Sequence, residues 1–531
     1  MTVSPAAPDL ARARVPGALV GAALAVALVP FALFVWRFDF VCDDAYITFR
    51  YARNFAEGRG LVYNPGVEPP VEGYSEFLWA VLLRLGFDAG VAPEVLSRVL
   101  SIAAGAGLVV LCVFTLARRF APSPVALLGA SLVLGCAPPL AVWSTGGMAT
   151  APTALLAVAL FVVTYRPLVG GASTLRRGAL VGLLAVLLAL LRADAALLVA
   201  LVLSPPIVVG LVQRRPAVWR PALIGASVGA AAFAAHVAWR LSFYGDWVPN
   251  TARAKIGFSA RAAGRGLDYV VSAFLSMPGL AIACAGALVG AWAGRRRLGP
   301  ATASGTAGLV LGVTLYAIAT GGDFMCFARF LLPAIPFAVL GFGAALHLVE
   351  ARSRLTAAGL AAGTALLTVL AAFDVHVVPE PARRAFHFRH NQTLSGVAPS
   401  TSEVEQWRNM RARAELWAET GRALARHAPP EASVVFGAVG AIGYFSNLFV
   451  YDRNGLVTRE VALREPHRTL RSPGHDKVVP PEYFLRYEPT YLDVGIWPEA
   501  SLPPPAMAGV RLLRLGPAER AGWILWARPG R

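Results

Sequence analysis

For a chain of 531 residues, the sequence has few charged residues, few lysines and few cysteines. Charged residues make up 15% of the chain and hydrophobic residues 56%, whereas a soluble protein of this length needs a far more polar surface. Lysine occurs only at positions 255 and 477, so nearly all of the positive charge behind the net +17 is arginine. The five cysteines form no CxxC pair and no spacing typical of metal ligands. These features exclude an ordinary soluble enzyme and give no sign of a metal centre.

The arginines stand in short clusters between apolar runs, for example at Arg118/Arg119 and Arg295–Arg297, and not along one face. This pattern argues against a nucleic-acid partner and is typical of the cytoplasmic loops of a membrane protein. The apolar runs are long enough, at roughly 20 residues each, to cross a bilayer. We therefore expect a polytopic α-helical protein of the bacterial cytoplasmic (inner) membrane, with its N-terminus inside. The eleven expected spans lie near 17–36, 95–117, 122–142, 148–165, 178–191, 195–212, 218–240, 269–293, 301–320, 330–350 and 354–373.

The alternation of inside and outside loops places the long segment 37–94 outside the membrane. Only one crossing fits between this segment and the cytoplasmic Arg118/Arg119 pair, so the apolar stretch 73–87 is not a span. Its apolar residues recur at helical spacing from Tyr74 to Leu85, which predicts a helix lying in the membrane interface.

The composition changes after residue 373, where a charged helical pattern is followed by several short strand-like segments. We expect two domains: a transmembrane domain at 1–373 and an extracytoplasmic α/β domain at 374–531. The glycines at 437, 440 and 443 do not have the GxGxxG spacing of a dinucleotide site, so turn and packing roles are the better interpretation.

Two adjacent carboxylates, Asp43 and Asp44, begin the external segment at the membrane boundary. In one interpretation, Asp44 caps the following helix and Asp43 favours its N-terminal dipole. In the other, one carboxylate is a general base and its neighbour fixes its geometry or raises its pKa. The two interpretations are compatible, because a capped helix holds a base in place.

Three further groups of polar residues fall on the same side of the membrane. Asp323 and Arg329 stand in "GGDFMCFARFLLPAIP", as a loop pair or as a phosphate site built on the guanidinium fork. Arg192 lies in "LLRADAALL", either as a functional ionisable residue in apolar surroundings or at the corner that follows a short fifth span. The stretch "RLSFYGDWVPNTARAK" ends at Lys255 and also carries aromatic residues common at membrane interfaces.

Taken together, these motifs resemble those of the GT-C membrane glycosyltransferases. The blocks "DDAYITFRYARNFAEGRGLVYNPG", "VEGYSEFLW", "FYGDWVPNTARAK", "GGDFMCFARFLLPAIP", "DRNGLV" and "SPGHDK" are most similar to the subgroup of the terminal β-(1→2)-arabinofuranosyltransferase and the flagellar motor control proteins. The resemblance implies an inverting transfer from a polyprenyl-phosphate-linked sugar donor. One departure concerns Ala149, because relatives often have glutamate there, so the sugar is not inherited from the arabinose enzymes.

From this resemblance we expect an extracytoplasmic glycosyltransferase (hexosyl- or pentosyltransferase) that acts on a glycan, lipid or protein acceptor. It requires no cofactor, and although some members of the class use a divalent metal, the sequence shows no separate ligand set. Asp44, slightly favoured over Asp43, is the expected catalytic base, and Arg329, Lys255 and Arg192 are expected to bind the donor phosphate. The expected substrate-binding residues are Asp323, Tyr46, Arg50, Tyr244, Asp246, Asn250, Glu72 and Tyr74.

Two other classes of function remain as alternatives. The first is a non-catalytic membrane scaffold in envelope or flagellar assembly. The second is a transporter, which is disfavoured because transporters place ionisable residues near mid-membrane between repeated, broken helices. Here these residues gather at one boundary, and no internal repeat is visible.

Overall fold

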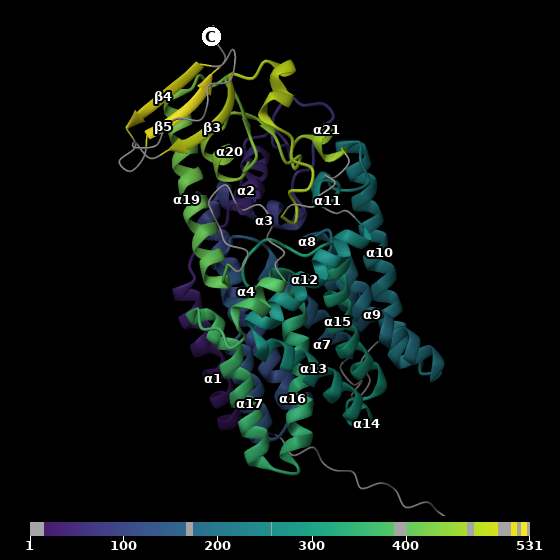
Figure 1. Cartoon of the computed structure of the whole chain (residues 1–531). Helices are drawn as coiled ribbons and strands as arrows, with labels where there is room; N and C mark the ends of the chain where they lie inside the picture. Colours follow the sequence, from purple (N-terminus) through teal and green to yellow (C-terminus); the bar gives the residue numbers. More distant parts are fainter. Residues whose placement is uncertain are drawn as a thin grey trace, which may run out of the picture.

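The computed structural model describes residues 15–165, 174–255, 258–386, 401–464, 472–497, 511–517 and 522–527. It is a bundle of long helices with a small α/β region at one end (Figure 1). The bundle helices are α1 (Gly17–Arg37), α4 (Pro93–Thr115), α5 (Pro124–Gly135), α6 (Pro138–Thr145), α7 (Thr150–Tyr165), α8 (Thr174–Leu191), α9 (Ala195–Val212), α10 (Pro216–Tyr244), α12 (Ala260–Ser276), α13 (Pro278–Ala293), α15 (Pro300–Ala319), α16 (Ile335–Glu350) and α17 (Arg354–Val369).

The helices of the described residues confirm a polytopic membrane protein. Eight are long and apolar enough to cross a bilayer, or up to ten spans if each bent pair counts as one. The remaining expected span is α7, which is apolar but has only 16 residues. The long span α4 continues through a short π-helical turn, η1 (Leu116–Phe120), and the span that contains α16 begins with the 3₁₀ turn η2 (Arg329–Ala334).

Two of the predicted spans are broken by proline. The expected span 122–142 consists of α5 and α6, which meet at 43°, and 269–293 falls on α12 and α13, which meet at 106°. Pro138 and Pro278 begin the second helix of each pair, because proline has no N–H to continue the preceding one. The span predicted at 269–293 is therefore not straight: it bends sharply at Pro278, and α12 packs against α15.

The helix predicted at the interface is α3 (Phe77–Asp88), whose 12 residues are too few to cross a bilayer. It packs beside α2 (Asp43–Ala56) at the end of the bundle that carries the α/β region (Figure 1). The segment 37–94 thus forms two short helices and no second span, as the sequence predicts.

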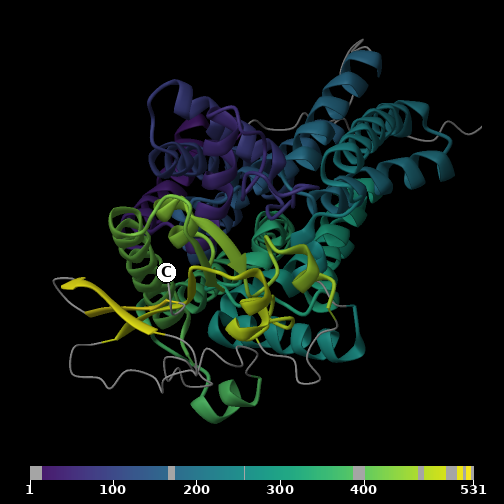
Figure 2. The same cartoon turned by 90° about the horizontal axis from the view of Figure 1, so that it is seen from above.

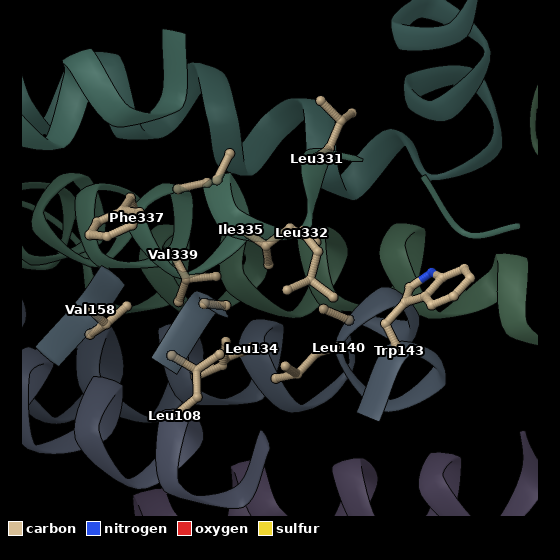
Figure 3. Close-up of a cluster of buried hydrophobic side chains, with 14 of the residues drawn as sticks. Leu108, Leu134, Leu140, Trp143, Val158, Leu331, Leu332, Ile335, Phe337 and Val339 are labelled. Carbon is tan, nitrogen blue, oxygen red and sulfur yellow. The ribbon is translucent and has the colours of Figure 1, made fainter. Parts of the chain in front are cut away.

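The core of the bundle lies around α16, and 78% of the span to which this helix belongs is buried. Figure 3 shows the packing, in which Phe337 and Val339 of α16 face Leu108, Leu134 and other apolar side chains of α4 to α7. Close packing at this position fixes the 3₁₀ turn η2 at the end of the bundle, and with it the side chain of Arg329.

The C-terminal part contains the long helix α19 (Glu403–His427) and a five-stranded mixed sheet (Figures 1 and 2). The strand order is β2-β1-β3-β5-β4, with β1 parallel to β2 and β3, and β5 antiparallel to β3 and β4. The strands are β1 (Ser433–Phe436), β2 (Phe449–Asp452), β3 (Tyr491–Trp497), β4 (Arg511–Pro517) and β5 (Gly522–Ala527). The short elements are α11 (Asn250–Lys255), α14 (Arg295–Leu298), η3 (Leu370–Phe373), α18 (Glu380–Ala385), α20 (Ala441–Ser446), α21 (Arg459–Ala462) and η5 (Pro481–Tyr487).

Candidate functional site

The paired carboxylates occupy the first turn of α2, but neither is its cap. The N-cap residue is Cys42, whose side chain makes no capping hydrogen bond. The carboxylate of Asp43 accepts hydrogen bonds from the backbone N–H groups of Gly440 and Ala441, at 3.2 and 2.7 Å. The capping interpretation of Asp44 is therefore wrong, and Asp43 instead ties α2 to the start of α20 in the C-terminal part.

Asp44 points the other way and pairs with Lys255. The Nζ atom of Lys255, the last residue of α11, lies 2.9 Å from Oδ2 of Asp44. Two segments that are 211 residues apart in the chain thus bring the expected base and one expected phosphate ligand into contact.

The other two expected phosphate ligands are also paired with carboxylates. Nε of Arg329 lies 2.7 Å from Asp323, and this pair is almost fully buried. Arg192 holds Asp194 through two hydrogen bonds of 2.9 and 2.8 Å, and Glu76 through a third of 3.0 Å. The sequence motifs containing Arg192 and Arg329 therefore form preorganised ion pairs.

All three cations and Asp44 line one cavity of about 290 Å³ at the end of the bundle. Two of the eight expected substrate-binding residues, Asp323 and Tyr74, also line this cavity. Glu76, which was not among the expected residues, lines it as well. A small apolar pocket of about 40 Å³ continues from the cavity between α7, α9, α15 and η2. The two spaces share Arg192, Asp194, Tyr316, Arg329 and Phe330.

A second, larger cavity of about 510 Å³ lies on the other side of Asp44, between the bundle and the C-terminal part. Asp44 and Lys255 line both cavities, whereas Asp43 lines only the larger one. The larger cavity has a mainly apolar lining, in which aliphatic residues such as Met410, Leu416 and Ile442 take part. Polar and aromatic side chains of α19 and of the loops at the sheet are placed within this lining: Gln406, Asn409, Arg413, Trp417, Arg453, Asn454 and His475.

The two neighbouring carboxylates differ in their acidity. Burial opposes the charge of Asp44, but Lys255 and Arg329 outweigh it and hold the pKa of Asp44 below its ordinary value. Burial dominates for Asp43 and raises its pKa to about 7, even though two backbone N–H groups favour its charged form. Asp44 is therefore ionised at neutral pH, while Asp43 titrates there.

A segment of the C-terminal part completes the wall between the cavities. Asp476 forms a buried ion pair with Arg265 of α12, with N–O distances of 2.8 and 3.0 Å, and so fixes residues 472–476 against the bundle. Burial, with Lys255 adding to it, lowers the pKa of His475, so this ring is neutral at pH 7. The C-terminal part is thus a component of the site itself.

Six expected substrate-binding residues do not line either cavity. Tyr46 packs against Tyr444 and Phe445, and Tyr244 is hydrogen-bonded to Tyr74 and to the carbonyl of Leu61. Arg50 and Asn250 donate hydrogen bonds to backbone carbonyls of the C-terminal part. The two acidic residues form ion pairs: Glu72 with Arg240, and Asp246 with Arg253 and Arg459. These contacts hold the walls of the site in position.

Sequence reasoning did not single out Glu76 or His475, although both lie within quoted motifs. Glu76 is buried, binds Arg192 and accepts the N–H of Ala149 at 3.4 Å. A glutamate inside the apolar run "SEFLW" is a signal that could have identified it, because such a charge requires a partner. Within the described residues, no cluster of three or more His, Cys, Asp or Glu side chains is arranged to hold a metal ion.

Replacing Arg50 with methionine is expected to destabilise the fold by about 3–5 kcal/mol, because three buried hydrogen bonds from a charged donor are lost. The carbonyls of Tyr63 and Gly443 keep a second donor, from Asn54 and Asn447. The guanidinium of Arg50 lies 2.9 Å from the carbonyl of Tyr63 and 2.7 Å from those of Gly443 and Leu448. Thermal unfolding in detergent measures this effect. The matched control is Arg53→Met, one turn further along α2 at a more exposed position, which should cost far less. Equal losses in the two variants would contradict this role of Arg50.

The helical bundle and the C-terminal part share their overall fold with solved structures of another membrane protein. Two crystal structures of ArnT from Cupriavidus metallidurans match this chain over nearly the whole length. The undecaprenyl phosphate complex has a TM-score of 0.55 at 13% identity and covers 97% of this chain and 98% of that chain. The apo state has a TM-score of 0.55 at 15% identity and covers 96% and 98%.

Other comparisons add less. The archaeal oligosaccharyltransferase AglB from Archaeoglobus fulgidus matches with a TM-score of 0.48 at 10% identity, covering 82% of this chain and 64% of that chain, which is too weak to carry an argument. Residues 404–528 match a family model described as a domain of unknown function, DUF8728. No curated protein matches the sequence significantly.

Proposed function

We propose that this protein is an inverting glycosyltransferase that moves a sugar from a polyprenyl-phosphate donor to an acceptor at the extracytoplasmic face of the bacterial inner membrane. The observation that carries the proposal is the cavity in which a buried carboxylate, Asp44, stands beside Lys255, Arg192 and Arg329. A base and several cations in one cavity at the end of a helix bundle suit a lipid-linked phosphate whose head group reacts at the membrane surface.

The smaller cavity is the proposed donor site. Lys255, Arg192 and Arg329 bind the phosphate, and the apolar pocket beyond Arg192 and Arg329 receives the first part of the isoprenoid chain. The fold shared with ArnT, which was crystallised with undecaprenyl phosphate, supports a ligand of this chemistry.

The larger cavity is the proposed acceptor site. Its amide and guanidinium side chains can hydrogen-bond the hydroxyl groups of an acceptor, and its aromatic side chains can pack against a sugar ring. An acceptor hydroxyl approaching through it meets Asp44, which lines both cavities and takes the hydroxyl proton. The oxygen then forms a bond to the anomeric carbon while the bond from that carbon to the phosphate oxygen breaks. The cations stabilise the negative charge that grows on the departing phosphate.

The identity of the sugar is left open within the pentoses and hexoses. The resemblance to the terminal arabinofuranosyltransferase and flagellar motor control proteins suggests a subgroup. However, residue 149 is alanine, and it presents only a methyl group where relatives often have a carboxylate. Glu76 brings a carboxylate to the backbone of this same residue, which would give the donor cavity a different arrangement of acidic groups.

The test uses the purified protein in lipid nanodiscs and undecaprenyl phosphate as the probe. We expect saturable binding, and we expect that Arg192→Met and Lys255→Met each weaken it at least tenfold because a phosphate ligand is lost. Mass analysis of envelope glycans from a deletion strain should show loss of one terminal sugar, restored by the wild-type gene. Absence of binding together with unchanged glycans would favour a scaffold.

A further inference from the structure

The three cations of the donor site are all neutralised by protein carboxylates, so a donor phosphate must compete for them. The pairs differ in strength. Arg192 makes three short hydrogen bonds to two carboxylates, and Arg329 is held by Asp323 and by the sulfur of Met148, 3.0 Å from its guanidinium. Among the residues that the structure describes, Lys255 has one ion pair, the 2.9 Å contact with Asp44.

Lys255 is also the most accessible of the three. Its side chain is 31% exposed, compared with 11% for Arg192 and 7% for Arg329. An ammonium group on a flexible stem can change partner by rotating, whereas the planar fork of Arg192 is fixed by its two-point pairing with Asp194. Arg329 is held by its burial and by its contacts with Asp323 and Met148. Lys255 is therefore the cation that an incoming phosphate takes most easily.

The loss of this contact changes Asp44. While it is paired, Asp44 offers an oxygen that is already engaged by a charged donor, which makes it a weak proton acceptor. Once Lys255 turns to a phosphate, that oxygen faces the wall between the two cavities without its counter-charge, close to where an acceptor hydroxyl arrives.

The surroundings of Lys255 allow such a movement. Its stem passes Gly474, and a Cβ at that position would lie 3.4, 3.5 and 3.7 Å from Cγ, Cδ and Cε of Lys255. These distances are ordinary van der Waals contacts, so Gly474 leaves the stem of Lys255 free space at this position; its φ of +81° is itself a reason for a glycine here. The segment that carries Gly474 is fixed by the ion pair between Asp476 and Arg265.

We propose that Lys255 is shared between Asp44 and the donor phosphate, so that donor binding releases the base. Lys255 then acts as a positioning residue that keeps Asp44 engaged until a donor is present, which protects the empty site from unproductive proton transfer. This inference rests on the proposed function and deepens it. It assigns Lys255 two successive partners in the same site.

The experiment compares the binding of undecaprenyl phosphate to four variants in nanodiscs. Removing the competing carboxylate with Asp44→Asn should tighten binding by about two- to fivefold relative to wild type, the fold-change that corresponds to the loss of one competing ion pair. Lys255→Met should weaken binding. The double variant Asp44→Asn/Lys255→Met should bind as Lys255→Met does, because removing Asp44 can help the phosphate only where Lys255 is present. Asp88→Asn, which removes one exposed carboxylate remote from both cavities, is the charge-matched control and should bind as wild type.

Binding by Asp44→Asn that equals or is weaker than wild type would overturn the inference, and so would a gain that persists in the Lys255→Met background. Asp44→Ser provides a second variant should the asparagine protein be unstable, with thermal unfolding as the check on folding. If wild type and all variants fail to bind the probe, the proposed function itself fails. If wild type binds but Asp44→Asn shows no gain, only the sharing of Lys255 is refuted.

Discussion

Replacing Asp44 with asparagine is expected to lower sugar transfer by about 10²- to 10⁴-fold, the usual contribution of a positioned general base. The side chain keeps its size, so insertion and folding should be preserved. The measurement is the rate of sugar transfer by membranes containing the variant, at matched protein level and with its thermal unfolding midpoint recorded. The variant should bind undecaprenyl phosphate more tightly than the wild type does, which separates loss of chemistry from loss of the site.

The neighbouring variant Asp43→Asn is the matched control for this experiment. The structure gives Asp43 a different task, because its carboxylate accepts two N–H groups at the start of α20. Asparagine offers one oxygen in place of two, so the expected effect is weaker docking of the C-terminal part and a lower unfolding midpoint. If Asp44→Asn kept most of its activity while Asp43→Asn lost it, the assignment of the two carboxylates would have to be reversed.

The second large effect is expected at Arg329. Arg329→Met leaves Asp323 buried without its counter-charge, which should cost about 3–5 kcal/mol of stability. The same variant should also lose affinity for undecaprenyl phosphate. Thermal unfolding and probe binding, measured on the same preparation, record the two losses.

The double variant Asp323→Asn/Arg329→Met separates the two roles of this arginine. Because the isolated charge is removed, most of the stability should return, whereas binding of the probe should not. Recovery of binding along with stability would show that Arg329 acts only through the fold and does not contact the phosphate.

Much of the architecture could be predicted because it depends on local pattern. Arginine clusters and apolar lengths gave the order of the spans, and the spacing from Tyr74 to Leu85 identified α3 as a short helix. The breaks at Pro138 and Pro278 were missed because an apolar run continues through both prolines. Hydropathy does not distinguish a straight span from one that bends, although the prolines themselves were a visible signal.

The residues of the site could be predicted from the sequence, but the partner of each charged side chain could not. The alternation of inside and outside loops predicted that Asp44, Lys255, Arg192 and Arg329 lie on the same side of the membrane, and the structure brings all four into one cavity. The partners depend on contacts between distant segments, such as Arg192 with Glu76 across 116 residues. No periodicity in the sequence carries that information.

The expected substrate-binding residues that do not line the cavity also show that side-chain partners cannot be predicted from local sequence. Asn250 and Lys255 belong to one short helix, yet Lys255 faces Asp44 while Asn250 faces the carbonyls of Gly455 and Leu456. A motif identifies the segment that approaches the site, but the orientation of the helix decides which of its side chains enters the cavity. Asp43 binds Gly440 and Ala441, which lie almost 400 positions later in the chain (|i−j| of 397 and 398). The residues around Asp43 predict a helix cap and contain no sign of these distant partners.

The most direct test of the account is a structure of the purified protein in nanodiscs with undecaprenyl phosphate bound. We expect phosphate density in the smaller cavity, with Lys255 turned away from Asp44 and hydrogen-bonded to the phosphate. We expect the isoprenoid chain to leave the cavity past Arg329 and Phe330. Density for the lipid at another surface, with this cavity empty and the pair between Lys255 and Asp44 intact, would contradict it.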